Sequence, residues 1–466
     1  MSDCVLGGRP PEIGVVGTLV HISHSKRQGV VMNQWRAAAI GGEGLSAAPD
    51  PAAQPDIGEV WRGIPRRRSP GRARKVFLYS HDTYGLGHLR RNLAIAEHLL
   101  ARTPGFSVRL LTGSPVIGNW RLPEGLNVTA LPPVVKTGVE TYAPRYSTLP
   151  FGLVKAYREA LILKSVIEES PDIFLVDHAP AGMNAELLST LAFIRRELPE
   201  TQVVLGLRDI LDSPETVREI WRQQGIIPLL ENLYDRVLVY GCRALFDVVE
   251  GYGIPSRVAE KLNYCGYVSR PARRGPAKPV SGKPTVLVTA GGGEDGYFLM
   301  EAYLRTLALS ARGRVRSRIV TGPLMSAARR HALNELAGND PNIEIIIATM
   351  DLPRMLEEAD LVIAMGGYNT SVEIIASGKP AIIVPRAAPR AEQRMRAAML
   401  ARMGLVWSVE PGAELAERLA QVIDDVLDGA TLRSSVNPLD LDGARRVGNL
   451  FESVTKADAK ERETVQ

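Results

Sequence analysis

Cysteine, long apolar runs and net charge are all scarce in this chain of 466 residues. The three cysteines, Cys4, Cys242 and Cys265, are widely spaced and odd in number, which argues against a disulfide framework and against a zinc site. We therefore expect a cytoplasmic protein. No apolar run approaches the roughly 18 residues that a membrane-spanning helix needs, so any membrane contact should be peripheral, at the inner face of the membrane.

The net charge of +5 is small for this length, and much of it lies in a basic stretch from Arg66 to Lys75 that contains no acidic residue. This stretch suits an anionic membrane surface or nucleic acid, but a solvated linker is the commoner explanation, and we expect no nucleic-acid partner. Residues 1–73 are rich in Gly, Pro and Ala and show little periodicity. They are expected to form a disordered extension, or to precede an alternative start such as Met32.

From Lys75 onward, short apolar runs alternate regularly with helix-like segments. This alternation predicts an α/β fold with doubly wound, mainly parallel sheets. A Pro-rich stretch at 269–284 interrupts it and is read as a linker. The expected strands are 75–80, 108–111, 128–131, 173–176, 203–207 and 237–240 before the linker, and 285–290, 318–320, 343–347, 361–365, 381–384 and 405–409 after it.

The predicted organisation is therefore two Rossmann-like domains that face a ligand cleft. The first domain is expected at 74–268 and the second at 285–430, followed by a C-terminal helix and tail at 431–466. Residues 132–150 are rich in Pro, Gly, Thr and Tyr, and we expect them to form a long loop near the cleft.

The most informative stretch follows the predicted strand 361–365, where Gly366 and Gly367 open a helical segment. Ligands of open α/β sheets bind at this end of a strand, and the N–H groups of a helix N-terminus attract anions. Two glycines also let a phosphate or a sugar approach the main chain. The alternative is an ordinary βαβ unit, in which Thr370 and Glu373 have the spacing of a capping box.

A second turn, Gly85-Leu-Gly-His88, follows the strand 75–80 but fails the dinucleotide fingerprint. Arg90 stands where the third glycine belongs, and the next strand lacks the following acid, so a nicotinamide or flavin enzyme is not expected. His88 at the start of a helix either serves as a base or is a hydrogen-bonded structural residue. Arg90 and Arg91 are electrostatically misplaced in a first helical turn unless an anion lies nearby.

A third turn, Gly291-Gly-Gly293, has the form of a phosphate cradle made from main-chain donors. Glu294 and Asp295 follow it and would repel a phosphate placed directly on them. Binding of sugar hydroxyls, or simple helix capping, fits these two acids better.

Two charged pairs end apolar strands of the first domain, namely Asp177-His178 and Arg208-Asp209. Both are expected at the cleft edge of the sheet, because the carboxyl ends of parallel strands meet there. Each pair could orient an acceptor hydroxyl or an anion, or could equally be a satisfied structural pair.

With these residues assembled, the chain resembles glycosyltransferases of the GT-B type. It is most similar to glycosyltransferase family 28, which includes the enzyme that adds N-acetylglucosamine to the lipid-linked precursor of peptidoglycan. It is closer still to uncharacterised bacterial predicted glycosyltransferases that share Ser-His-Asp-x-x-Gly-x-Gly-His-x-x-Arg. The resemblance covers about residues 74–430, and the donor signature consists of Gly367, Thr370, Glu373, Gly378, Pro380, Pro385 and Gln393.

The resemblance implies a role for each position. Glu373 would bind the ribose hydroxyls, and Gln393, with Glu392 beside it, would bind the donor sugar. The phosphates would lie on Gly366 and Gly367, and the nucleobase on the main chain of 348–350. A departure from the family is that Glu294 and Asp295 replace the small and amide residues usual after the glycines.

For catalysis, His88 is the candidate base, and main-chain N–H groups with Arg90 or Arg386 would stabilise the departing diphosphate in place of a metal. The expected donor-binding residues are Gly291, Gly292, Gly293, Met350, Gly366, Gly367, Asn369, Thr370, Glu373, Arg386 and Gln393. The expected acceptor or phosphate contacts are Gly85, Gly87, Arg90, Arg91, Asp177 and Arg208.

The leading hypothesis is a metal-independent glycosyltransferase without a cofactor. It would move a hexose-type sugar from a nucleotide diphosphate, with UDP as the expected nucleotide, to a hydroxyl of a glycan or lipid-linked acceptor. Two alternatives stay open. One is a nucleotide-sugar 2-epimerase of the same fold, and the other is a non-catalytic nucleotide-sugar-binding protein.

Overall fold

The computed structural model describes residues 72–82, 87–102, 105–119, 122–138, 141–268, 282–311, 314–349, 351–386, 390–432 and 439–463. The disordered extension expected at 1–73 lies almost wholly outside this range, as do residues 269–281 of the expected linker. Gly85 and Met350 also lie outside the described residues. Their roles and the domain boundaries therefore stay predictions.

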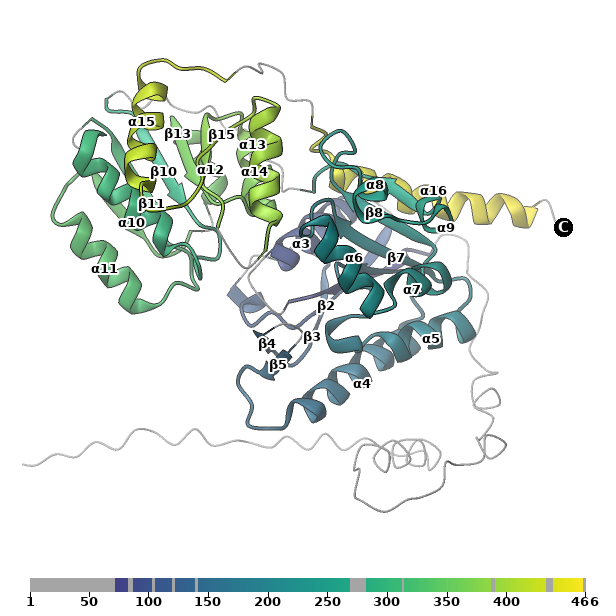
Figure 1. Cartoon of the computed structure of the whole chain (residues 1–466). Helices are drawn as coiled ribbons and strands as arrows, with labels where there is room; N and C mark the ends of the chain where they lie inside the picture. Colours follow the sequence, from purple (N-terminus) through teal and green to yellow (C-terminus); the bar gives the residue numbers. More distant parts are fainter. Residues whose placement is uncertain are drawn as a thin grey trace, which may run out of the picture. The chain divides into compact units, whose positions relative to one another are not determined.

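Two parallel sheets organise the described chain (Figure 1). The first has seven strands in the order β3-β2-β1-β6-β7-β8-β9, and all neighbouring pairs are parallel. Its strands are β1 (Arg74–Ser80), β2 (Phe106–Thr112), β3 (Asn127–Ala130), β6 (Ile173–Asp177), β7 (Gln202–Arg208), β8 (Arg236–Tyr240) and β9 (Leu262–Tyr264). The chain winds outward from β1 to β3 and later outward from β6 to β9, so the winding direction reverses between β1 and β6.

The second sheet has six strands in the order β12-β11-β10-β13-β14-β15, again all parallel. They are β10 (Thr285–Thr289), β11 (Arg316–Val320), β12 (Ile343–Ile346), β13 (Leu361–Ala364), β14 (Ala381–Ile383) and β15 (Trp407–Ser408). Here the winding direction reverses between β10 and β13. The predicted fold of two doubly wound sheets is thus confirmed. We call the parts built on them the first and the second lobe.

The stretch predicted as a long loop at 132–150 instead contains an antiparallel hairpin of β4 (Val134–Gly138) and β5 (Thr141–Pro144). The prediction of an irregular loop is wrong there, because Val134, Val135 and Tyr142 favour extended backbone and Val134 is buried. Strand β9, at the edge of the first sheet, was also not predicted.

The helices of the first lobe are α3 (Gly87–Leu100), α4 (Phe151–Glu169), α5 (Leu188–Glu197), α6 (Pro214–Gln223), α7 (Ile226–Leu233), α8 (Val248–Tyr252) and α9 (Ser256–Ala259). Helix α3 buries Leu89, Leu93, Ala96 and Leu99, which recur every three or four residues along one face. Burial of one leucine contributes about 1.5–3 kcal/mol to stability. This stripe therefore fixes α3, which carries His88, against the sheet.

The last helix, α16 (Gly443–Glu463), packs against α3 of the first lobe. Arg102 at the end of α3 donates to Glu452 Oε1 at 2.9 Å, and Arg74 donates to the Glu452 carbonyl at 3.4 Å. Phe451 is fully buried in the same core cluster as α3. The end of the chain thus returns to the first sheet after the second lobe.

Alternation along the strands of the second sheet divides its apolar residues between two faces. Val286 and Val288 of β10 face a cluster that contains residues of α10 (Tyr297–Thr306), α11 (Ala327–Ala337) and α15 (Leu415–Leu427). Leu287 faces a cluster that contains residues of α12 (Leu352–Glu358), α13 (Tyr368–Ser377) and α14 (Glu392–Arg402). The second cluster continues into the core of the first lobe, so α13 and α14 join the two lobes.

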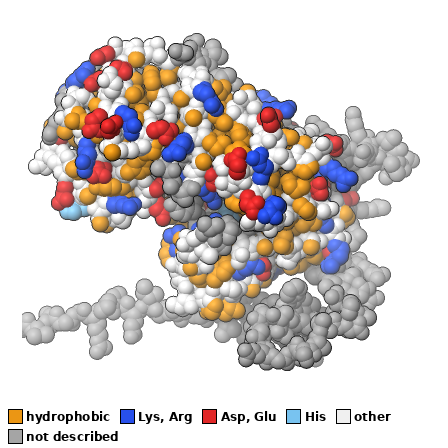
Figure 2. Space-filling model, in the orientation of Figure 1, with side chains coloured by type: hydrophobic (Ala, Val, Ile, Leu, Met, Phe, Trp, Pro, Cys, Tyr) orange, Lys and Arg blue, Asp and Glu red, His pale blue; other side chains and the backbone are white. Residues whose placement is uncertain are grey.

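Acidic and basic side chains are interspersed on the face seen in Figure 2. Among the described helices, none is both long and apolar enough to cross a membrane.

Candidate active site

Several of the predicted site residues follow the four strands at which the two sheets change winding direction. His88 lies in the first turn of α3, the helix that follows β1, and Asp177 ends β6, the neighbour of β1 in the first sheet. In the second sheet, the turn 291–293 follows β10 and the turn 366–367 follows its neighbour β13. Open α/β sheets bind ligands at such switch points because the loops diverge there and leave a crevice.

His88 and Asp177 form a hydrogen-bonded pair in the first lobe. His88 Nδ1 lies 2.7 Å from Asp177 Oδ2. An ionised carboxylate can only accept, so we assign the Nδ1 proton to this bond and leave the lone pair on Nε2. The imidazole is therefore held in the tautomer that a general base requires.

Arg91 and Asn92 also hold the Asp177 carboxylate. Arg91 Nη2 donates to Asp177 Oδ1 and Oδ2 at 2.8 and 2.9 Å, and Asn92 Nδ2 donates to Oδ2 at 3.3 Å. Burial alone would raise the pKa of Asp177, but the Arg91 guanidinium and His88 outweigh it and lower this pKa to about 2. Asp177 is therefore ionised throughout the neutral range.

The predicted contact of Arg91 and Asp177 with an acceptor or a phosphate does not fit this arrangement. The guanidinium of Arg91 is buried on Asp177 and lies over the rings of Tyr240 and Tyr368, at 5.3 and 5.4 Å from their centroids. Asp177 instead orients His88, and Arg91 holds Asp177 in place. The sequence could not show this pairing, because α3 and β6 are far apart in the chain.

Two further histidines lie beside His88. His178 was expected at the cleft edge as part of the Asp177-His178 pair, whereas His81 was not among the expected site residues. The ring centroids of His81 and His178 lie 5.8 and 5.0 Å from that of His88. Burial lowers the pKa of His81 to about 3 and that of His178 well below its usual value, so both are neutral at pH 7. Their Nδ1 atoms are buried without a hydrogen-bond partner among the described residues. The sequence indicates their place in the site only by position, because each directly follows a strand at which the sheet changes winding direction.

The two glycine turns of the second lobe lie side by side and differ in how crowded they are. A Cβ at Gly293 would lie 1.9 Å from the Thr321 carbonyl oxygen, and one at Gly366 would lie 2.8 Å from that of Gln393. Only glycine fits these positions. At Gly367, by contrast, a Cβ would meet no described atom within 4 Å. The main chain is therefore open to a ligand at Gly367.

Helix α13 begins with Gly367 as its N-cap residue, and no side chain caps it. Thr370 is consequently inside the first turn, and the capping-box alternative for Thr370 and Glu373 is wrong. Glu373 forms an ion pair with Arg90 of the first lobe instead. Asn369 Nδ2 donates to the Gly87 carbonyl oxygen at 3.1 Å, so α3 and α13 meet at their N-terminal turns.

Arginines and carboxylates from both lobes meet beside Gln393. Glu392 lies 3.0 Å from Arg208 of the first lobe and 3.2 Å from Arg386. Arg386 also lies 2.9 Å from Asp295, so this acid neither caps α10, whose N-cap is Gly296, nor points away from the site. Burial would raise the pKa of Glu392, but the surrounding arginines lower it. Gln393 Oε1 accepts from the Arg386 main-chain N–H at 3.1 Å.

Comparison with known proteins shows which proteins the chain is similar to. Residues 285–436 match the glycosyltransferase family 28 C-terminal domain. The chain is 26% identical over 354 residues to the UDP-N-acetylglucosamine–N-acetylmuramyl-(pentapeptide) pyrophosphoryl-undecaprenol N-acetylglucosamine transferase of Solidesulfovibrio magneticus, covering 73% of this chain and 87% of that protein. These matches support a glycosyltransferase that is similar to family 28.

Solved structures support the GT-B fold of this glycosyltransferase. MurG of Acinetobacter baumannii has a TM-score of 0.50 and 14% identity, over 82% of this chain and 99% of that one. A protein described as a putative UDP-N-acetylglucosamine 2-epimerase from Listeria monocytogenes has a TM-score of 0.53 and 14% identity, over 84% and 98%. The fold is therefore shared by transferases and epimerases, and fold likeness alone does not separate the two.

No group of His, Cys, Asp and Glu in the described part of the glycosyltransferase has an arrangement that could hold a metal ion. The three histidines at the first switch point are included in that statement.

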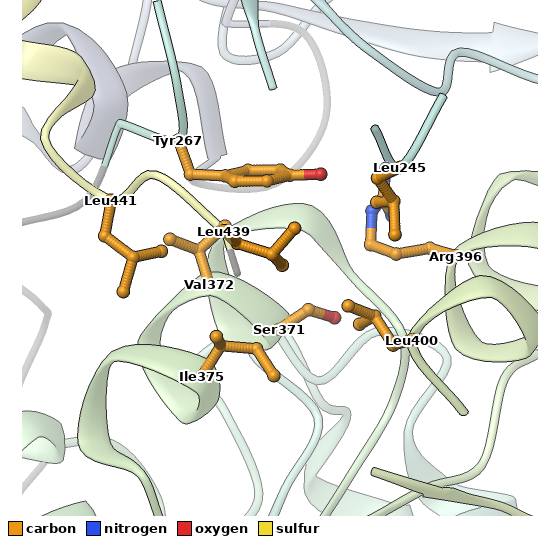
Figure 3. A pocket seen from close by; sticks show the side chains of 9 residues that line it. All are labelled: Leu245, Tyr267, Ser371, Val372, Ile375, Arg396, Leu400, Leu439 and Leu441. Atoms are coloured by element: carbon orange, nitrogen blue, oxygen red, sulfur yellow. The ribbon is translucent and has the colours of Figure 1, made fainter. Parts of the chain in front are cut away.

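A small apolar pocket lies where the two lobes of the glycosyltransferase join (Figure 3). Tyr267 from the first lobe, Val372 and Leu400 from the second, and Leu439 from the returning chain line it. Its side chains are almost all aliphatic or aromatic and converge on a narrow space. We read it as imperfect packing at the junction of the lobes and not as the substrate site.

Proposed function

We propose that the protein transfers a hexose-type sugar from a nucleotide diphosphate sugar, with UDP as the nucleotide, to a hydroxyl of a glycan or lipid-linked acceptor, without a metal ion. The observation that carries this proposal is the His88–Asp177 pair at one switch point, joined through α3 and α13 to the open glycine turn at the other. The named activity of the Solidesulfovibrio relative, which uses a UDP-sugar and a lipid-linked acceptor, supports it.

On the acceptor side, His88 Nε2 takes the proton of the attacking hydroxyl as the bond to the sugar forms. Asp177 keeps the imidazole in the required tautomer and stabilises the imidazolium that results. A positioned base of this kind contributes roughly 10²–10⁴ to the rate. Arg91 keeps Asp177 ionised for this task.

On the donor side, the diphosphate would lie on the main chain at Gly366 and Gly367, at the N-terminus of α13. The helix dipole and the N–H groups stabilise the negative charge of the departing nucleotide diphosphate. Arg386 and Arg208 would add to this by exchanging part of their contact with Glu392 for a phosphate oxygen. Gln393 would bind the donor sugar.

The remaining donor contacts follow the family pattern. Glu373 would bind the ribose, with Asn369 and Thr370 in the same first turns of α13 and the turn 291–293 beside it. The nucleobase would lie against the main chain that follows β12. A thermal-shift screen of nucleotides tests the nucleotide choice, since a ligand that binds only the folded state raises the melting temperature. UDP should raise it, and no response to any nucleotide would contradict the proposal.

An epimerase is the second candidate, because the Listeria structure has the same fold at a similar TM-score. Incubation of the protein with UDP-N-acetylglucosamine alone, followed by chromatography of the sugar, separates the two. The proposal expects no 2-epimer. Accumulation of the 2-epimer without an acceptor would replace the transferase by the epimerase.

The proposal includes a peripheral membrane contact through one exposed apolar surface. We define this α4 patch as Tyr146, Leu149, Leu153 and Tyr157, whose exposed fractions lie between 48% and 76%. Leu153 and Tyr157 are four residues apart in α4 (Phe151–Glu169), so they share one side at its start, and Tyr146 and Leu149 lie in the segment just before the helix. Large apolar side chains exposed together favour a membrane or a partner over water.

A further inference from the structure

Two polar contacts join the first turn of α3 to the first turns of α13. One is the 3.1 Å hydrogen bond from Asn369 Nδ2 to the Gly87 carbonyl, and the other is the ion pair of Arg90 with Glu373. Gly87 and Arg90 are three residues apart, and Asn369 and Glu373 are four residues apart. Each pair therefore spans one helical turn, and the two contacts form successive rungs between the helices.

Arg90 is in an unfavourable position unless Glu373 is present. It lies in the first turn of α3, where the helix dipole repels a cation. Its side chain is 19% exposed, so water screens its charge only partly. Glu373, from the other lobe, supplies the anion that this position lacks.

Glu373 uses only one of its two carboxylate oxygens in this pair. Oε1 accepts from Arg90, whereas Oε2 is buried without a hydrogen-bond partner among the described residues. A buried acceptor without a partner is unfavourable, because it has lost its hydrogen bonds to water, so its persistence calls for a ligand or a water. Glu373 lies on the same helix as the open N-cap residue Gly367, less than two turns along α13.

We propose that Arg90 is a positioning residue for the donor, although it belongs to the acceptor-side lobe. It holds Glu373 by Oε1, so that Oε2 is presented to a ribose hydroxyl of the nucleotide. This inference rests on the proposed nucleotide-sugar donor. It makes ribose recognition depend on the contact between the lobes, because the carboxylate that reads the ribose is oriented from the opposite side.

The test compares the affinities of UDP and 2′,3′-dideoxy-UDP by isothermal titration calorimetry. Wild type should favour UDP by about tenfold or more, the effect of a hydrogen bond to a charged acceptor. Glu373→Met should remove this preference, and Arg90→Met should lower it to about two- to threefold. The double variant should be no worse than Glu373→Met, because the residues act as one unit. A loss of stability alone would weaken both ligands equally.

Arg90→Lys and Arg222→Met complete the experiment. Lysine keeps the charge without the planar fork, so Arg90→Lys should give a preference between those of wild type and Arg90→Met. Arg222 forms an exposed pair with Glu219 on α6, and its loss should leave the preference unchanged.

Two other outcomes have separate meanings. If Glu373→Met loses the preference and both Arg90 variants keep it, the role of Arg90 is refuted and the donor site stands. If wild type binds neither nucleotide, or Glu373→Met leaves the preference intact, the donor site of the proposed function fails and the inference fails with it.

Discussion

Three side chains of α3 converge on the carboxylate of Asp177, namely His88, Arg91 and Asn92. Asp177→Asn should lower kcat by about 10²–10⁴. The asparagine amide can donate an N–H to His88 Nδ1, so the ring proton can move to Nε2 and the base is lost. Steady-state kinetics measures this, with UDP affinity as the control. Unchanged kcat would show that Asp177 only serves packing.

His81 makes stability depend on pH at the residue scale. Its pKa is about 3 in the folded protein and 6.5 when unfolded, so the unfolded state binds the extra proton between these values. The contribution of neutral His81 to the free energy of unfolding is complete above pH 6.5 and declines as the pH falls towards 3. The melting temperature should therefore fall as the pH is lowered from 7 to 4. In His81→Asn the melting temperature should depend less steeply on pH. Equal slopes in both proteins would contradict this assignment.

At the scale of elements, the turn before α13 contains two glycines, and a side chain is disfavoured at each of them for a different physical reason. Gly366→Ala should destabilise the protein by about 1–3 kcal/mol, because the new methyl group meets the Gln393 carbonyl. Gly367→Ala should keep the melting temperature and weaken UDP binding about tenfold or more, since the methyl group enters the space proposed for the phosphates. Thermal melts and calorimetry separate the effects. Wild-type UDP affinity in Gly367→Ala would argue against a phosphate there.

The α4 patch gives a second prediction at this scale. Leu153→Asp with Tyr157→Asp should abolish cosedimentation with vesicles of phosphatidylglycerol and phosphatidylethanolamine, because burying the carboxylates in the lipid is costly. Leu336→Asp is the matched control, since Leu336 is 46% exposed on α11 of the other lobe. Binding that survives the double change, or that is lost in the control, would contradict the assignment of the patch.

At the scale of the whole molecule, the sequence predicts the two sheets because each strand is a local apolar run between helical patterns. The predicted strands all appear, and His88 lies in the first turn of α3, the helix that follows β1. The sequence did not predict which side chains pair with one another. Arg91 and Arg90 were both expected to meet an anion, and each does, but the anions are Asp177 and Glu373, which lie 86 and 283 positions away.

The hairpin β4-β5 and the histidines beside His88 show the same limit. Pro and Gly in 132–150 suggested an irregular loop, whereas burial of Val134 favours pairing. His81 gains a place beside His178 and His88 only from the strand order, which brings β1 and β6 together. Local patterns give elements, while the pairing of charges depends on how the elements pack.

The most direct test follows radiolabelled sugar from UDP-N-acetylglucosamine into lipid-extractable or polymeric product on bacterial membranes, with wild type or His88→Gln added, beside calorimetry with UDP. We expect incorporation with wild type, a fall of about 10²-fold or more with His88→Gln, and UDP affinities within about twofold of each other. Equal incorporation by both proteins, or no UDP binding by either, would contradict a glycosyltransferase that uses His88 as its base.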